Sequence, residues 1–222
     1  MNRLVGTVKG MTTKPEGSAR DRLLAAANEL FYEEGVHTVG IDRVIERAGV
    51  AKASLYSTFG SKEELVRAYL QQRAEARQQR VSTRIAQSED PRTRILSIFD
   101  LLGELTADPK YRGCAFVNAS AEGRRDEKSK VSQVCLDSRS WARGLFTELA
   151  RDCGADDAEE LGRQLVLLYD GAAVAAAMER DLSAAERAKV MASALIDAQT
   201  TADADKAGGG KRTAKKSVRA AK

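Results

Sequence analysis

The stretch from residue 41 to residue 62, IDRVIERAGVAKASLYSTFGSK, constrains the fold more than any other part of the chain. Val44, Ile45 and Ala48 recur at the spacing of one helix face. Gly49 follows them, at a point where a helix must end in a backbone conformation that glycine adopts at little cost. The pattern therefore predicts a short helix that stops at Gly49 and leads into a tight turn.

A second short helix and the start of a third follow this turn. Val50 and Leu55 supply two apolar anchors that face the first helix. Ser61 and Glu64 have the spacing of a capping box, so a new helix begins there. Two short helices joined by a tight turn and followed at once by a third predict a helix-turn-helix motif.

The outer face of the second short helix is small, polar and cationic. It carries Lys52, Ser54, Ser57 and Thr58. Lysine can bind phosphates or guanine acceptors, and hydroxyl groups can bind bases or phosphate oxygens, so this face suits DNA. The alternative is three ordinary core helices in which Tyr56 and Phe59 are simply buried. A purely structural helix pair has no need of such a face, which favours DNA binding.

A longer set of residues with fixed spacing surrounds the motif. It comprises the helix ARDRLLAAANELFYEEG, then Gly35, Ile41, Ala48-Gly49-Val50, Leu55-Tyr56, Phe59 and Ser61-Lys62-Glu63-Glu64-Leu65. Over residues 18–78 this set closely resembles the amino-terminal DNA-binding domain of TetR-family transcriptional regulators, with the helix-turn-helix at about residues 41–60. A string of this length is far more specific than a lone short motif.

The resemblance assigns roles to individual residues and implies that double-stranded DNA is the partner. It implies that Tyr56 and Lys62 hold DNA phosphates. It also places a group of residues at or near the base edges, namely Lys52, Ala53, Ser54, Ser57 and Thr58. The chain departs from the family pattern at Gly40, where many members cap the second helix with Thr, and at Ile45, where Ala is usual.

The rest of the chain has helical periodicity, and no strand pattern competes, so we expect an all-α fold. Ser18 and Asp21 suit the start of the first helix, which Gly35 ends. The helix from residue 62 to about 87 becomes rich in Gln and Arg, as a connector between domains would. The spacing of apolar residues and caps predicts further helices at about 91–108, 112–122, 131–149, 157–178 and, behind a capping box at Ser183 and Glu186, up to 198.

The last two predicted helices present small apolar faces rich in Ala. In the TetR family, the corresponding helices of two chains pair into a four-helix bundle, so the resemblance implies a homodimer. One short helix reads few base pairs, whereas two such helices roughly 34 Å apart would match successive major grooves of a palindromic operator. The alternative, that the Ala-rich faces pack within one chain, stays open.

TetR-like regulators usually bind a small-molecule effector in the helical core of the second domain, and the resemblance implies the same here. The candidate lining residues are aromatic or polar side chains on otherwise apolar helices, namely Phe99, Cys114, Phe116, Asn118, Trp141 and Tyr169. Each of them also suits an ordinary core position. Cys114 fits either a thiol sensor or an inert buried cysteine.

The formal net charge of +4 comes from one end of the chain. Residues 203–222 contain seven basic and two acidic residues, so they account for +5 and leave −1 for the remainder. This segment reads as a disordered basic tail that either attracts DNA through counterion release or has no role. Residues 1–17 read as a flexible arm that either reaches a minor groove or contacts nothing specific.

Several functions have no support in the sequence. The three cysteines have no paired spacing and His37 is the only histidine, so no metal or cofactor is expected. Ser54, His37 and Asp42 lack the nucleophile setting of a hydrolase, so we expect no enzyme. The longest apolar run, residues 165–178, contains Asp170 and is too short to cross a bilayer, and no signal segment is evident, which favours a cytoplasmic protein.

Together these observations predict four segments. They are a flexible arm at 1–17, a DNA-binding domain at 18–78, a ligand-binding and dimerisation domain at 79–202 and a basic tail at 203–222. The predicted function is a dimeric transcriptional regulator, a repressor released from its operator by a small molecule. The alternative is a nonspecific or architectural DNA-binding protein that uses the basic tail, which would show no large preference for one operator.

Overall fold

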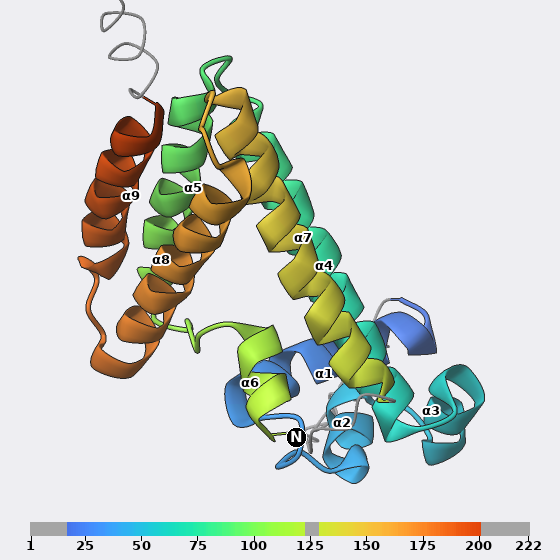
Figure 1. Cartoon of the computed structure of the whole chain (residues 1–222). Coiled ribbons are helices and arrows are strands. Elements are labelled where there is room, and N and C mark those ends of the chain that lie inside the picture. The colour runs from blue at the N-terminus through green and yellow to red at the C-terminus, as the bar shows by residue number, and fades with distance from the viewer. Residues whose placement is uncertain (1–16, 123–128, 201–222) are drawn as a thin grey trace, which may run out of the picture. The chain divides into compact units, whose positions relative to one another are not determined.

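The computed structural model describes residues 17–122 and 129–200, and all regular structure within them is α-helical (Figure 1). The predicted all-α fold is therefore confirmed. The helices are α1 (Ala19–Glu34), α2 (Ile41–Ala48), α3 (Lys52–Phe59), α4 (Lys62–Ile85), α5 (Pro91–Thr106), α6 (Ala115–Glu122), α7 (Lys130–Asp152), α8 (Ala158–Glu179) and α9 (Ala184–Thr200). The predicted basic tail, and the predicted arm apart from Gly17, lie outside the described residues.

The chain divides into two compact units, and the division falls between Tyr69 and Leu70, inside α4. The domain boundary predicted from the sequence, between residues 78 and 79, falls inside the same helix. The first unit contains α1, α2, α3 and the start of α4. The second contains the remainder of α4 and helices α5 to α9.

Local sequence signals set the helix ends of the first unit. The Ser18 hydroxyl accepts a hydrogen bond from the Asp21 backbone N–H, and the Asp21 carboxylate accepts one from the Ser18 backbone N–H, both at 3.2 Å. This is the reciprocal cap that starts a helix. Gly49 ends α2 in the left-handed region, with φ 61° and ψ 42°. A side chain at that position would be strained, so the predicted turn depends on this glycine.

The first unit is built on a small apolar core shared by α1, α2 and α3. Leu23 of α1, Val44 of α2 and Leu55 of α3 are completely buried. Phe31 of α1 packs edge-on against Tyr69, with ring centroids 5.7 Å apart. The three short helices are therefore held by interdigitated side chains rather than by their intrinsic helix stability.

The second unit has a larger core between α5, α7, α8 and α9. In Figure 1, α5 lies beside α9, α9 beside α8, and α8 beside α7. Ile95 of α5, Leu161 and Leu165 of α8 and Ile196 of α9 are all buried in this core. Within residues 17–122 and 129–200, no helix has the length and apolar character needed to cross a bilayer.

Helices α7 and α8 approach each other closely at Gly162. A Cβ atom added to this glycine would lie 2.9 Å from the Thr147 backbone nitrogen and 3.0 Å from its Cα. Backbone atoms cannot move aside as a flexible side chain can, so the contact requires a residue without a side chain. Gly144 of α7 has no atom within 4 Å of the corresponding position.

We therefore expect Gly162→Ala to lower the free energy of unfolding by about 1–3 kcal/mol through overpacking. The control Gly144→Ala should leave it unchanged or raise it by up to about 1 kcal/mol, because alanine favours the helix. Urea unfolding followed by circular dichroism, at a fixed protein concentration, measures both. Equal effects of the two substitutions would contradict the close approach of α7 and α8.

Candidate DNA-binding face and effector cavity

Helix α3 is anchored by one side chain and presents most of its remaining surface to solvent. Leu55 is completely buried, whereas Tyr56 is 47% exposed. The other exposed residues of this helix are Lys52, Ala53, Ser57 and Thr58, while Ser54 and Phe59 are half-buried. The structure thus places the predicted base-reading residues on the outer side of α3, with Ser54 at the edge of the exposed face.

The hydroxyl groups of Ser57 and Thr58 on this face are hydrogen-bonded to the helix backbone. Thr58 donates its hydroxyl proton to the Ser54 carbonyl oxygen at 2.6 Å, and Ser57 donates to the same oxygen at 3.2 Å. Both hydroxyl oxygens still have lone pairs that can accept a hydrogen bond. In this state the face offers hydroxyl acceptors, and either hydroxyl can become a donor by rotating away from the backbone.

Lys52 at the start of α3 forms an ion pair with Asp42 of α2, with Nζ and Oδ1 2.9 Å apart. The hydrogen bond to Asp42 raises the pKa of Lys52, so this side chain is cationic at neutral pH. Both partners are well exposed, and exposed pairs are weak and screened by salt. An acceptor on another molecule can therefore replace Asp42 as the partner of Lys52.

Lys62 is the first residue of α4 and is half-buried. The Ser61 hydroxyl accepts a hydrogen bond from the Glu64 backbone N–H at 3.2 Å, which fixes the start of this helix as predicted. The position of the Lys62 backbone is therefore set by a helix cap one residue away.

The second unit contains a cavity of about 450 Å³, bordered by α4, α5, α6, α7 and α8. Four of the predicted lining residues do border it, and these are Cys114, Phe116, Trp141 and Tyr169. The volume falls in the range typical of small-molecule sites.

The other two predicted lining residues lie elsewhere. Phe99 is buried in the core, with its ring centroid 6.1 Å from those of Phe146 and Tyr169. Asn118 donates from its side-chain amide to the Arg112 carbonyl oxygen at 2.9 Å. Phe99 supports the aromatic wall from behind, and Asn118 holds the loop before α6.

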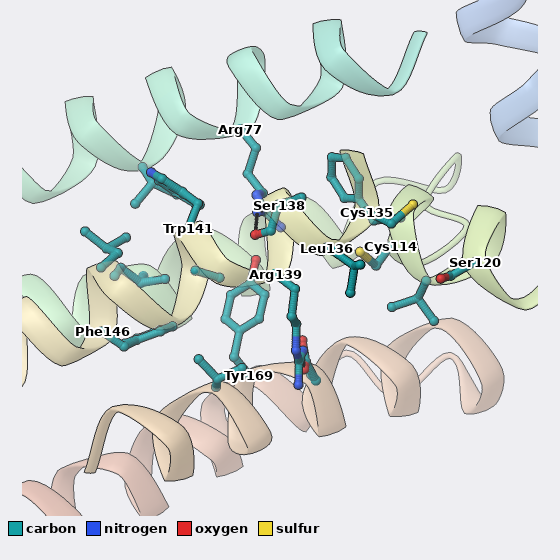
Figure 2. A pocket seen from close by; sticks show the side chains of 18 of the residues that line it. Arg77, Cys114, Ser120, Cys135, Leu136, Ser138, Arg139, Trp141, Phe146 and Tyr169 are labelled. Atoms are coloured by element: carbon teal, nitrogen blue, oxygen red, sulfur yellow. Dashed lines mark hydrogen bonds and ion pairs between the residues drawn. The ribbon is translucent and has the colours of Figure 1, made fainter. Parts of the chain in front are cut away.

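Sequence reasoning missed the main charged group of the cavity, Arg77 of α4. Its Nη2 donates to the carbonyl oxygen and to the hydroxyl of Ser138 on α7, both at 2.8 Å (Figure 2). Its guanidinium carbon lies 5.0 Å from the ring centroid of Phe116 and 4.9 Å from that of Trp141. The sequence held a signal for this position, because Arg77 precedes the apolar Val81 by one helical turn and so lies on the same face of the helix.

Burial lowers the pKa of Arg77, because the charged guanidinium is largely shielded from water. Two aromatic faces offset part of this cost, at about 0.5–2 kcal/mol each. A second arginine at the cavity, Arg139, forms an ion pair with Asp170. Asp170 is the charge that interrupts the longest apolar run of the sequence, and Arg139 is its partner.

Two cysteines border the cavity near α6, and Figure 2 shows both of them there. Burial raises the pKa of the Cys135 thiol to about 11, and Cys114 contributes in the same direction. Both sulfurs are free thiols. Within the described part of the chain, no three His, Cys, Asp or Glu side chains are grouped as metal ligands would be.

We expect Cys135 to resist alkylation in the folded protein. At pH 8 a thiol with a pKa of about 11 is ionised in about one molecule per thousand, and the thiolate is the reactive form. Labelling with iodoacetamide followed by peptide mass spectrometry should find Cys135 far slower than in the same protein unfolded in guanidinium, and faster as the pH rises toward 11. Equal rates in folded and unfolded protein at pH 8 would contradict its burial.

Comparison with known proteins supports this arrangement. Residues 23–69 match the model of bacterial regulatory proteins of the tetR family. A TetR-family transcriptional regulator from Streptomyces coelicolor has a solved structure that aligns with a TM-score of 0.78 at 33% identity, over 82% of this chain and 96% of that one. The chain belongs to the TetR family, as the sequence pattern predicted, and is a DNA-binding transcriptional regulator.

Two further relatives differ in the direction of their control. The transcriptional activator FasR of Mycolicibacterium smegmatis is 27% identical over 150 residues, and the match covers 64% of each chain. The transcriptional repressor NemR of Escherichia coli is 29% identical over 147 residues, which cover 64% of this chain and 70% of NemR. Both activation and repression therefore occur among the relatives of this chain.

Proposed function

We propose that the protein is a homodimeric, cytoplasmic repressor that leaves a palindromic operator when a small molecule occupies the cavity of its second unit. The main support for the proposal is the exposure of a polar, cationic face on α3, which the burial of Leu55 holds in place. In this proposal the first unit binds DNA, and the second binds the effector and dimerises. The helix α4 belongs to both units and couples the two events.

The proposed DNA contacts divide into two kinds. Tyr56 and Lys62 hold phosphates, which fix the position of the protein but carry little sequence information. The residues proposed at or near the base edges are Lys52, Ala53, Ser54, Ser57 and Thr58. The exposure of Tyr56 supports its role, since a tyrosine that served only the core would be covered.

Exposed apolar side chains on α8 and α9 support the dimer. Most of the large exposed hydrophobic residues in the described part of the chain belong to these two helices or the loop between them, and these are Leu167, Val174, Met178, Leu182, Val190 and Met191. An apolar surface of this kind marks an interaction site, and pairing with a second copy would cover it. Two copies would then present two α3 helices to one palindrome.

Repression is the direction we propose, and the NemR relative supports it, whereas FasR is an activator. Selection of bound duplexes from a random DNA library tests sequence-specific binding. We expect one palindromic sequence to be enriched and to bind far more tightly than unrelated DNA. A protein that coats DNA through its basic tail would bind selected and unrelated duplexes alike. A reporter gene placed behind the selected operator then decides between repression and activation.

We expect Lys62→Ala to weaken binding to every duplex, because a lysine bound to a phosphate confers no base preference. The slope of log K against log salt should become shallower by about one for each phosphate that is no longer neutralised. Fluorescence anisotropy with the selected operator over a series of salt concentrations measures both effects.

The control for Lys62 is Lys110→Ala, which removes the same charge from an exposed residue of the second unit. It should change neither the affinity nor the salt slope. By contrast, Thr58→Val should alter which bases are preferred in a repeated selection. If Lys62→Ala and Thr58→Val both bind the wild-type operator unchanged, the assignment of α3 as the reading helix is wrong.

The dimer has its own test in Met191→Glu. Met191 of α9 and Leu136 of α7 are both 56% exposed, so the same substitution at Leu136 is a matched control. We expect Met191→Glu to raise the dimer dissociation constant at least tenfold, because it would bury an unpaired charged group in the interface. Leu136→Glu should leave the dissociation constant unchanged. Size-exclusion chromatography with light scattering over a range of concentrations measures both. A wild-type protein that stays monomeric at micromolar concentration would overturn the proposal.

A further inference from the structure

The cavity of the second unit has apolar walls and one side chain whose charge is not balanced. Phe116, Trp141 and Tyr169 contribute aromatic surface, and Leu145 and Val166 contribute aliphatic surface. Arg77 reaches from α4 across to α7 and ends beside Ser138 in the view of Figure 2. A cavity of this composition suits a ligand with an apolar body and a single polar group.

The charges at the cavity do not cancel. Arg139 is paired with Asp170, so its charge is already balanced. Arg77 forms no ion pair with any carboxylate among residues 17–122 and 129–200. The charged neighbours whose field reaches it are Arg80 and Arg139, both cationic, together with the ionisable side chains of Cys114 and Tyr169. Counted over the described residues that border it, the cavity therefore presents one net positive charge.

The hydrogen-bond donors of Arg77 are also incompletely used. Its Nη2 is satisfied by Ser138, but its Nε is buried and has no acceptor within the described residues. A buried donor without a partner costs free energy that an incoming acceptor recovers. Stacking between Phe116 and Trp141 holds the guanidinium in place, so its free donors are pre-organised for a ligand.

From the charge, the free donors and the apolar walls, we propose that the effector is a monocarboxylate with an aromatic or aliphatic body, and that its carboxylate binds Arg77. One unbalanced arginine matches one negative charge, and the planar guanidinium matches a planar carboxylate. A phosphate dianion would need a second cation, but the charge of Arg139 is already balanced by Asp170.

This inference deepens the proposed function, and it rests on the cavity being the effector site. It also gives the effector a route to the DNA-binding unit, because Arg77 lies on the same continuous helix as Lys62. A carboxylate that binds Arg77 therefore acts on α4 directly. The coupling is reciprocal, so operator binding must weaken carboxylate binding by the same factor.

The chain carries its own reporter for this site. Trp141 is the only tryptophan of the sequence, it borders the cavity, and it stacks on Arg77. Its fluorescence can be titrated with two pairs of probes that share a skeleton, namely decanoate with decanol and phenylbutyrate with phenylbutanol. We expect saturable binding, with at least one carboxylate at least tenfold tighter than its matched alcohol.

Arg77→Gln is the direct test, and Arg80→Gln is its control. Arg80 lies one turn further along α4, is exposed and does not border the cavity, so the control removes the same charge from the same helix. We expect Arg77→Gln to weaken carboxylate binding about 10- to 100-fold, the range for removal of a charged hydrogen bond, and to leave alcohol binding within about twofold. Arg80→Gln should stay within about twofold of the wild type for all four probes, because the field of this exposed charge is screened by water and salt.

Several outcomes would overturn the proposal. These are a wild-type protein that binds neither pair, one that binds each alcohol as tightly as its carboxylate, or an Arg77→Gln variant that keeps the preference for carboxylates. The comparison of each carboxylate with its alcohol uses the wild-type protein alone, so it tests the proposal even if Arg77→Gln fails to fold. The titration contains no DNA, so its failure is distinct from a failure to bind the operator, which anisotropy measures separately.

Discussion

The burial of Leu55 is the interaction on which the DNA-binding unit depends. It is the one completely buried side chain of α3, and full burial of a leucine contributes about 1.5–3 kcal/mol. Because the helix is short, it cannot stand alone in water and needs this anchor. The left-handed turn at Gly49 sets the direction in which α3 leaves α2. The burial of one leucine and the turn at one glycine thus leave the opposite face of α3 exposed to solvent.

Much of this unit could be predicted from the sequence because its signals are local. Ser18 with Asp21, and the glycines that end α1 and α2, act within one turn of a helix, so residue type and spacing suffice. The same reasoning failed at the start of α9. A capping box was expected between Ser183 and Glu186, but the Ser183 backbone N–H, which would donate to the Glu186 carboxylate in that motif, donates to the Asp181 carboxylate at 3.0 Å instead. The Asp181 carboxylate, two residues before Ser183, competes for this N–H, and the spacing of Ser183 and Glu186 alone could not reveal that.

The cavity was harder to predict because it joins residues that are distant in the sequence. Arg77 and Ser138 are 61 positions apart, and only the packing of the second unit brings them together. The Gln- and Arg-rich part of α4 suggested a connector between domains, and the structure shows that Val81 within it is buried. Phe99 and Tyr169 have the same aromatic character, but Phe99 packs behind the cavity wall while Tyr169 borders it. Residue type made both of them candidate lining residues, and only the fold shows which one borders the cavity.

The central claim is that α3 reads DNA, and a structure of the protein bound to its selected operator tests it most directly. We predict two copies of the chain on one duplex, each with α3 in the major groove and with the grooves one helical turn apart. Lys62 should lie against a phosphate, and Ser57 or Thr58 should lie within hydrogen-bond distance of a base edge. A complex in which α3 faces away from the duplex, or in which another element occupies the groove, would contradict the account.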